Sequence, residues 1–76
     1  MDSTLEVYEV GTAVVLADDI EAKIVQVAIH AGNWIQYECA WWNGGSRVRE
    51  WFVSGDFVVA KKAPRMKIGF ARETEE

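Results

Sequence analysis

The sequence is poor in the residues that small domains use for covalent or metal crosslinks. Cys39 is the only cysteine and His30 the only histidine among 76 residues. One chain therefore has neither an internal disulfide nor a Cys/His zinc site, and we expect no structural metal and no cofactor. A core of this size contributes only about 3 to 5 kcal/mol. Good packing or association with another chain must supply the remaining stability.

Long apolar runs and targeting signals are also missing. The sequence contains no run of about eighteen apolar residues, and its start has no basic segment followed by an apolar one. We therefore expect neither a membrane span nor a signal peptide, no membrane partner, and a cytoplasmic location.

Positive charge is scarce. The chain has 8 Lys and Arg against 12 Asp and Glu, and its formal net charge is −4. Such a field repels nucleic acid and anionic lipid, so contact with either must be local. Acidic residues come before the first basic one, Lys23: Asp2, Glu6, Glu9, Asp18, Asp19 and Glu21. A basic stretch without acids lies near the other end: Lys61, Lys62, Arg65, Lys67 and Arg72. The two ends are expected to attract each other, within one chain or between copies, unless both are simply solvated surface charge.

Helical periodicity and internal repeats are absent, whereas short β-branched and aromatic runs recur about every ten residues between Gly, Asn and Asp. This spacing predicts one all-β domain, a five-stranded antiparallel barrel. The expected strands cover residues 12–17, 22–30, 34–42, 47–53 and 57–61, with an Asp-rich turn at 17–20.

The first long hairpin has a predicted three-residue loop, residues 31–33, with Asn33 in the left-handed conformation. This loop places apolar residues opposite one another: Val25, Val27 and Ile29 face Cys39, Tyr37 and Ile35. A two-residue Gly32-Asn33 turn would set the valines opposite Gln36 and Glu38, so we reject it.

Asn43-Gly44 predicts a two-residue type I′ turn for the next hairpin, because that turn needs positive φ at both central positions. The resulting core pairs are Cys39 with Val48 and Ile35 with Phe52. The outer pairs are Glu38 with Arg49 and Gln36 with Trp51. This pairing sets Glu50 opposite Tyr37, which is unfavourable. A three-residue loop, which would turn Trp51 and Val53 inward, stays open.

The C-terminal segment alternates apolar Met66, Ile68 and Phe70 with Lys67 and Gly69. Period-two alternation predicts a sixth strand over residues 65–71 that covers an edge of the barrel. The chain is thus divided into a barrel at 1–61 and a tail at 62–76, with Pro64 as a hinge. The strand can add to its own barrel or to that of another copy, and we expect a homo-oligomer, most simply a dimer.

Five short strands, Gly11 before the first and the Ser54-Gly55-Asp56 break before the last resemble the SH3-like barrels of the Tudor and KOW type over residues 8–61. The run from Gly32 to Gly45 also resembles short bacterial and phage proteins without an established activity. Tudor-type barrels imply an aromatic cage for methylated side chains. Here the first loop supplies Asp18 and Asp19 but no ring, and Trp41 and Trp42 come from one side only, so such a cage is incomplete.

Catalytic arrangements are not favoured. Cys39 is expected in the core and His30 outside it, so the imidazole cannot activate the thiol. Asn43-Gly44-Gly45-Ser46 leads into a strand, unlike a phosphate loop, and the acids at 18–21 lack the dense spacing of a calcium loop. We expect a protein that is not an enzyme.

Tryptophan is abundant, with four residues in the chain. A core this small cannot bury them all, and alternation places several on the outer face with Arg and Gln. The predicted binding residues are Trp34, Gln36, Trp42, Arg47, Arg49 and Trp51. We hypothesise protein binding or self-assembly through this face. The alternatives are single-stranded nucleic-acid binding by ring stacking, and coverage of the rings by the chain's own termini.

Overall fold

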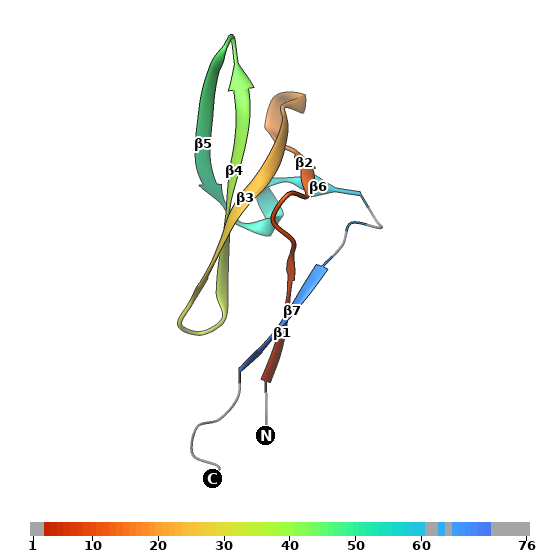
Figure 1. The fold of residues 1–76 in the computed structure, drawn as a ribbon, viewed down its shortest axis with the longest axis vertical. Coiled ribbons are helices and arrows are strands. Elements are labelled where there is room, and N and C mark those ends of the chain that lie inside the picture. The colour runs from red at the N-terminus through yellow and green to blue at the C-terminus, as the bar shows by residue number, and fades with distance from the viewer. Residues whose placement is uncertain (1–2, 61–62, 64, 71–76) are drawn as a thin grey trace.

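The computed structural model describes residues 3–60, 63 and 65–70, which form seven strands in two antiparallel sheets without an α-helix (Figure 1). The strands are β1 (Ser3–Tyr8), β2 (Ala13–Val15), β3 (Glu21–His30), β4 (Trp34–Asn43), β5 (Ser46–Phe52), β6 (Val58–Val59) and β7 (Arg65–Phe70). Two short 3₁₀ turns are η1 (Ala17–Asp19) and η2 (Ser54–Asp56). The all-β prediction is confirmed.

The larger sheet has the strand order β5-β4-β3-β2-β6. Four of its strands follow one another as hairpins, and β6 returns to pair with β2. Within the described residues β5 and β6 do not pair with each other, so this five-stranded sheet is open at both edges. The expected acidic turn is η1, where Asp18 and Asp19 both have positive φ.

The β3–β4 hairpin has the predicted three-residue loop, and Asn33 has φ 61°. Val27 lies opposite Tyr37 and Ile29 opposite Ile35, as expected. The predicted Val25–Cys39 pair is wrong.

A bulge between Ile24 and Gln26 causes this difference. The extra residue in β3 shifts the pairing, so that Ile24 lies opposite Cys39 and both are 0% exposed. Val25 is displaced from the core and lines the outer surface of the sheet.

The β4–β5 hairpin has a two-residue turn, but the turn is Gly44-Gly45 and not Asn43-Gly44. The glycines have φ 59° and 92°, as a type I′ turn requires, and glycine adopts these angles without a steric cost. All predicted partners are therefore displaced by two positions. The observed pairs are Trp41 with Val48, Ala40 with Arg49, Cys39 with Glu50, Glu38 with Trp51 and Tyr37 with Phe52.

A displacement of two residues leaves every side chain on its predicted face, because the strand alternates with period two. The three-residue loop that would have turned Trp51 inward is not formed. Glu50 lies opposite Cys39 instead of Tyr37, and it is exposed.

The smaller sheet is a ribbon of two strands, β1 and β7, which runs away from the larger sheet beside the β3–β4 hairpin (Figure 1). The predicted C-terminal strand is confirmed over Arg65–Phe70, and residue 71 lies outside the described residues, as do Lys61, Lys62 and Pro64. The expected pairing with an edge of the barrel is wrong: β7 pairs with Ser3–Tyr8 of the same chain, and these two strands form a sheet of their own. The attraction expected between the two ends occurs within the chain, where Arg65 lies 3.7 Å from Glu6.

The core lies between the inner face of the five-stranded sheet and the near end of the ribbon. Its buried residues are Val7, Val14, Leu16, Ala22, Ile24, Tyr37, Cys39 and Phe57. The rings of Tyr8, Tyr37 and Phe57 contact one another with centroids 5.5 to 6.1 Å apart. The backbone N–H of Tyr8 also donates to the Tyr37 hydroxyl at 3.3 Å. Tyr8 therefore connects the ribbon to the sheet.

Candidate functional site

The six predicted binding residues all lie on the outer face of the five-stranded sheet. In β4, alternation places Trp34, Gln36 and Trp42 on the face opposite Tyr37 and Cys39. In β5, Arg47 lies opposite Trp42 and Trp51 opposite Glu38, which puts Arg47, Arg49 and Trp51 on the same side. We call these six residues the Trp/Arg face.

The Trp/Arg face is a line of separated groups and not one cluster. Trp42 and Trp34 lie at opposite ends of β4, and Trp51 lies beside Glu38, midway between them. Each ring position lies four positions from the next, which is about 13 Å along a strand. The side chains of Trp34, Trp42 and Trp51 are 52%, 71% and 43% exposed. The three rings are therefore exposed at separate positions along the sheet and do not form one cluster.

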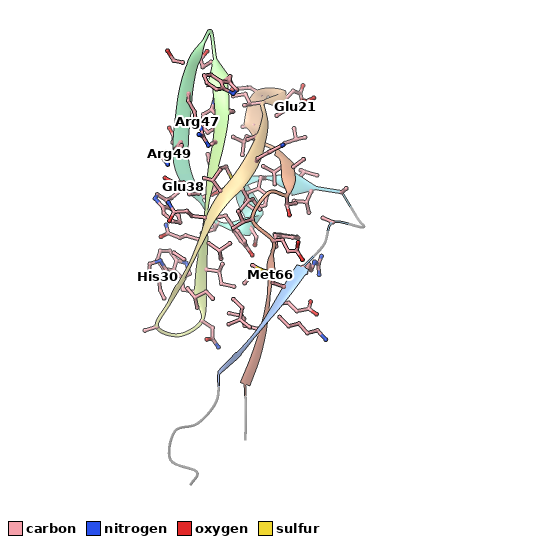
Figure 2. All side chains as sticks on the ribbon, viewed as in Figure 1. Glu21, His30, Glu38, Arg47, Arg49 and Met66 are labelled. Carbon is pink, nitrogen blue, oxygen red and sulfur yellow. The ribbon has the colours of Figure 1, made fainter. Side chains whose placement is uncertain are left out.

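A hollow of about 440 Å³ lies beside Trp42. The small side chains of Ala13 and Ala40, between larger neighbours, line it together with Val25. Glu21, Lys23, Trp42 and Arg47 add charge and a ring to its lining, and Figure 2 shows Glu21 at the same end of the sheet as Arg47.

Sequence reasoning missed Ala13, Glu21, Lys23 and Val25 as site residues. The β2–β3 and β3–β4 pairings bring them beside β4, and Val25 reaches the surface only because of the bulge. No spacing along the sequence reveals this proximity. Small residues at alternate strand positions, such as Ala40, were the only available indication.

At the other end of the Trp/Arg face, the polar side chains bind their own neighbours. His30 Nε2 lies 3.0 Å from Gln36 Oε1, and the His30 and Trp34 rings are 4.5 Å apart. Gln26 donates to Glu38 Oε1 at 2.7 Å. His30 therefore faces outward near Trp34, as predicted (Figure 2).

Cys39 lies on the inner face, opposite in direction to His30. Desolvation, with a further contribution from the Glu38 carboxylate, raises the pKa of the Cys39 thiol to about 11. The thiol is thus protonated at neutral pH and buried, and His30 cannot activate it. Trp41 and Trp42 also face opposite sides: Trp41 is half-buried, 6.2 Å from the Phe52 ring. Both residues contribute to the lining of the hollow beside Trp42, but their rings point to opposite faces of β4.

The cations of β5 stand without carboxylate partners among the described residues, where the single ion pair joins Arg65 and Glu6. Arg47 and Arg49 are exposed. Residues 3–60, 63 and 65–70 contain no group of three or more His, Cys, Asp or Glu side chains placed to hold a metal ion. The same part of the chain has no helix with the length and apolarity needed to cross a membrane.

Comparison with protein-family models, curated proteins and solved structures finds no match to this chain.

Proposed function

We propose that this protein is a non-catalytic binding module that associates through the Trp/Arg face with protein, in the first place with a second copy of itself. The observation that carries the proposal is the exposure of Trp34, Trp42 and Trp51 on the face that also bears Arg47 and Arg49. Trp and Arg are the residues most enriched at the energetic centres of protein interfaces.

The shape of the chain supports association. Its extents are 54 × 23 × 18 Å and its radius of gyration is 14.6 Å. A compact domain of this length has a radius of gyration of about 11 Å. The elongated form leaves more surface uncovered per residue, and a second copy would cover part of it. A closed two-fold dimer is the simplest assembly.

We assign the five-stranded sheet to the SH3-like architecture of the Tudor and KOW type, as a partly open barrel. The order β5-β4-β3-β2-β6 and the 3₁₀ turn at Ser54–Asp56 before β6 support this assignment. The architecture itself names no ligand, so the function rests on the exposed side chains.

Mass in solution tests the proposal. We expect the full chain to run as a dimer in light scattering, and Trp42→Ala and Arg47→Glu to shift it toward monomer with an unchanged circular dichroism spectrum. Val10→Ala is the matched control, because Val10 is 55% exposed but lies outside the Trp/Arg face. Self-association through this face would be refuted if the full chain is a monomer, or if the variants lose stability but remain dimers.

Single-stranded nucleic acid is the second candidate, because the three rings lie at regular intervals on the face that also bears Arg47 and Arg49. Base stacking contributes about 1 to 3 kcal/mol per base, which can offset an unfavourable net charge. Titration with an oligothymidine at low salt should then quench tryptophan fluorescence. Constant fluorescence removes this candidate.

A further inference from the structure

Strand β5 forms one edge of the five-stranded sheet. It pairs with β4 on one side over seven positions, and its other side is open in the described part of the chain (Figure 1). An open edge presents unpaired N–H and C=O groups to any extended segment that approaches it. Only β6, with two residues, lies at the opposite edge.

The turn determines which residues of β5 direct their backbone groups outward. A two-residue type I′ turn makes the flanking pair, Asn43 and Ser46, a hydrogen-bonded pair. Hydrogen-bonded and non-hydrogen-bonded pairs then alternate along the hairpin. The N–H and C=O groups that face away from β4 therefore belong to Arg47, Arg49 and Trp51.

These same three residues have their side chains on the outer face, so the open edge is flanked by two guanidinium groups and an indole. All three side chains are exposed. On the inner face, the side chains beside the edge include the half-buried Val48 and Phe52. The exposed Glu50 lies between these two on the same face. A strand added here would place alternate residues beside the outward arginines and Trp51, and the others beside Val48, Glu50 and Phe52.

A second copy of β5 is a poor occupant of this edge. The antiparallel two-fold pairing that uses all three outward residues sets Arg49 opposite Arg49 of the other copy. Pairings displaced by two positions set Arg47 opposite Arg49, or Glu50 opposite Glu50. Like charges directly opposite each other destabilise a strand pair. The arginines therefore disfavour self-pairing and favour a strand with carboxylates.

We propose that β5 binds an extended acidic segment of another protein, which adds to the sheet as a further strand beside β5. Carboxylates at alternate positions lie opposite Arg47 and Arg49, apolar residues lie beside Val48 and Phe52, and an uncharged residue lies beside Glu50. Backbone hydrogen bonds supply affinity and the arginines select the partner. This inference rests on the proposed function only in that Arg47, Arg49 and Trp51 also belong to the Trp/Arg face.

Amide exchange with a synthetic probe tests the proposal on the full chain. The probe is acetyl-Val-Thr-Thr-Glu-Val-Glu-Thr-amide, whose two carboxylates match Arg49 and Arg47 in antiparallel pairing. At about nine-tenths occupancy, exchange at Arg47, Arg49 and Trp51 should slow about tenfold, because only the free tenth of the protein exchanges. Exchange at Val48 and Glu50, already bonded to β4, should be slow throughout.

Two control peptides separate backbone pairing from charge. A peptide N-methylated at both Glu residues keeps its charge but loses two donors to β5, and its methyl groups clash with the edge, so we expect no protection. A peptide with Lys in place of Glu should bind at least about tenfold more weakly. Arg49→Glu should weaken the original probe similarly and restore the Lys peptide. Lys67→Glu, the same charge change on the ribbon, should leave both affinities unchanged.

Four outcomes overturn the proposal: no binding of the acidic probe, equal binding of the Lys peptide, binding without protection of the three outward amides, or an oligothymidine that displaces the probe and binds more tightly. Binding without protection would leave the Trp/Arg face as a side-chain surface. Trp34→Ala removes a ring of the Trp/Arg face at the end of β4 that does not pair with β5, so it should reduce self-association and leave binding of the probe unchanged. Failure of self-association and failure of the edge site are therefore distinguishable.

Discussion

The five-stranded sheet and the β1–β7 ribbon are stabilised by different kinds of contact. In the sheet, β3, β4 and β5 are joined by turns of three and two residues. In the ribbon, Ser3 lies opposite Phe70, so nearly the whole chain separates the paired residues. Closing so long a loop costs entropy before any contact compensates it.

The sheet also has more buried side chains than the ribbon. The sheet contributes Ile24, Tyr37 and Cys39 to the core at 0 to 3% exposure. Among the described side chains of the ribbon, Val7 alone is buried, at 1%. An isolated two-stranded ribbon is at best marginally stable in water. The ribbon therefore depends on docking to the sheet through Val7 and Tyr8, whereas the sheet contains its own turns and most of the core.

The largest effect is expected at Ile24, which lies at the bulge of β3 and is 0% exposed. Ile24→Ala should lower the free energy of unfolding by about 2 to 5 kcal/mol, because it leaves a cavity in the core to which both the sheet and the ribbon contribute residues. Urea denaturation measures the change. Val58→Ala, at a position 69% exposed, should change it by less than about 0.5 kcal/mol. Similar losses in the two variants would contradict this description of the core.

Gly45→Ala tests the dependence of the sheet on its turns. Gly45 has φ 92°, where a side chain is strained even though no atom lies within 4 Å of the added Cβ. The substitution should cost about 1 to 2 kcal/mol in the same denaturation experiment. Gly55→Ala is the matched control, since Gly55 also has open space and is not in the left-handed region. Equal stability of the two variants would argue against the Gly44-Gly45 turn.

Alkaline pH should lower the stability of the fold through ionisation of Cys39 on the inner face. Its pKa is raised from about 9 in the unfolded chain to about 11 in the fold, so between these values the unfolded state binds fewer protons. Stability is complete below pH 9 and is lost as pH rises; we expect a loss of about 1 kcal/mol between pH 8 and 10.

Cys39→Ala should flatten this pH dependence relative to its own value at pH 8. Some dependence should persist at still higher pH, because burial also raises the pKa of the Tyr37 hydroxyl. If Cys39→Ala leaves the slope of stability against pH unchanged, the thiol is not the source of that pH dependence.

Ile68→Ala tests whether the ribbon unfolds independently of the sheet. Ile68 is half-buried opposite Leu5 in the ribbon. We expect a loss of only about 1 kcal/mol overall, but faster amide exchange in β1 and β7 with little change at Val27 and Tyr37 in the sheet. Uniform acceleration in both regions would show that the ribbon and the sheet unfold as one unit.

The smallest effect is expected at the ion pair of the ribbon. Glu6 and Arg65 are about half exposed, and Arg65 also lies 5.1 Å from the centroid of the Tyr8 ring. A double-mutant cycle of Glu6→Gln and Arg65→Gln should give a coupling of at most about 0.5 kcal/mol, reduced further by salt. A coupling above about 1 kcal/mol would show that charge, and not Val7 and Tyr8, holds the ribbon.

Alternation and turn chemistry in the sequence determined the strands of the sheet and the faces of their side chains. Asn33 marked one turn, and Asn43-Gly44 marked the other to within one position of the observed Gly44-Gly45 turn, because few residues adopt positive φ. The six residues of the Trp/Arg face followed from period two alone, and an error of two positions in the β4–β5 pairing did not move any of them to the other face.

Tertiary structure alone decided which of these residues are neighbours. The bulge at Val25 accompanies the burial of Ile24 opposite Cys39, and no local pattern marks it. The pairing of Ser3–Tyr8 with β7 joins segments that are far apart in sequence, so neither segment specifies the other. The hollow beside Trp42 and the open edge of β5 likewise exist only once strand order is established, because each is formed by residues brought together by pairing and not by spacing along the chain.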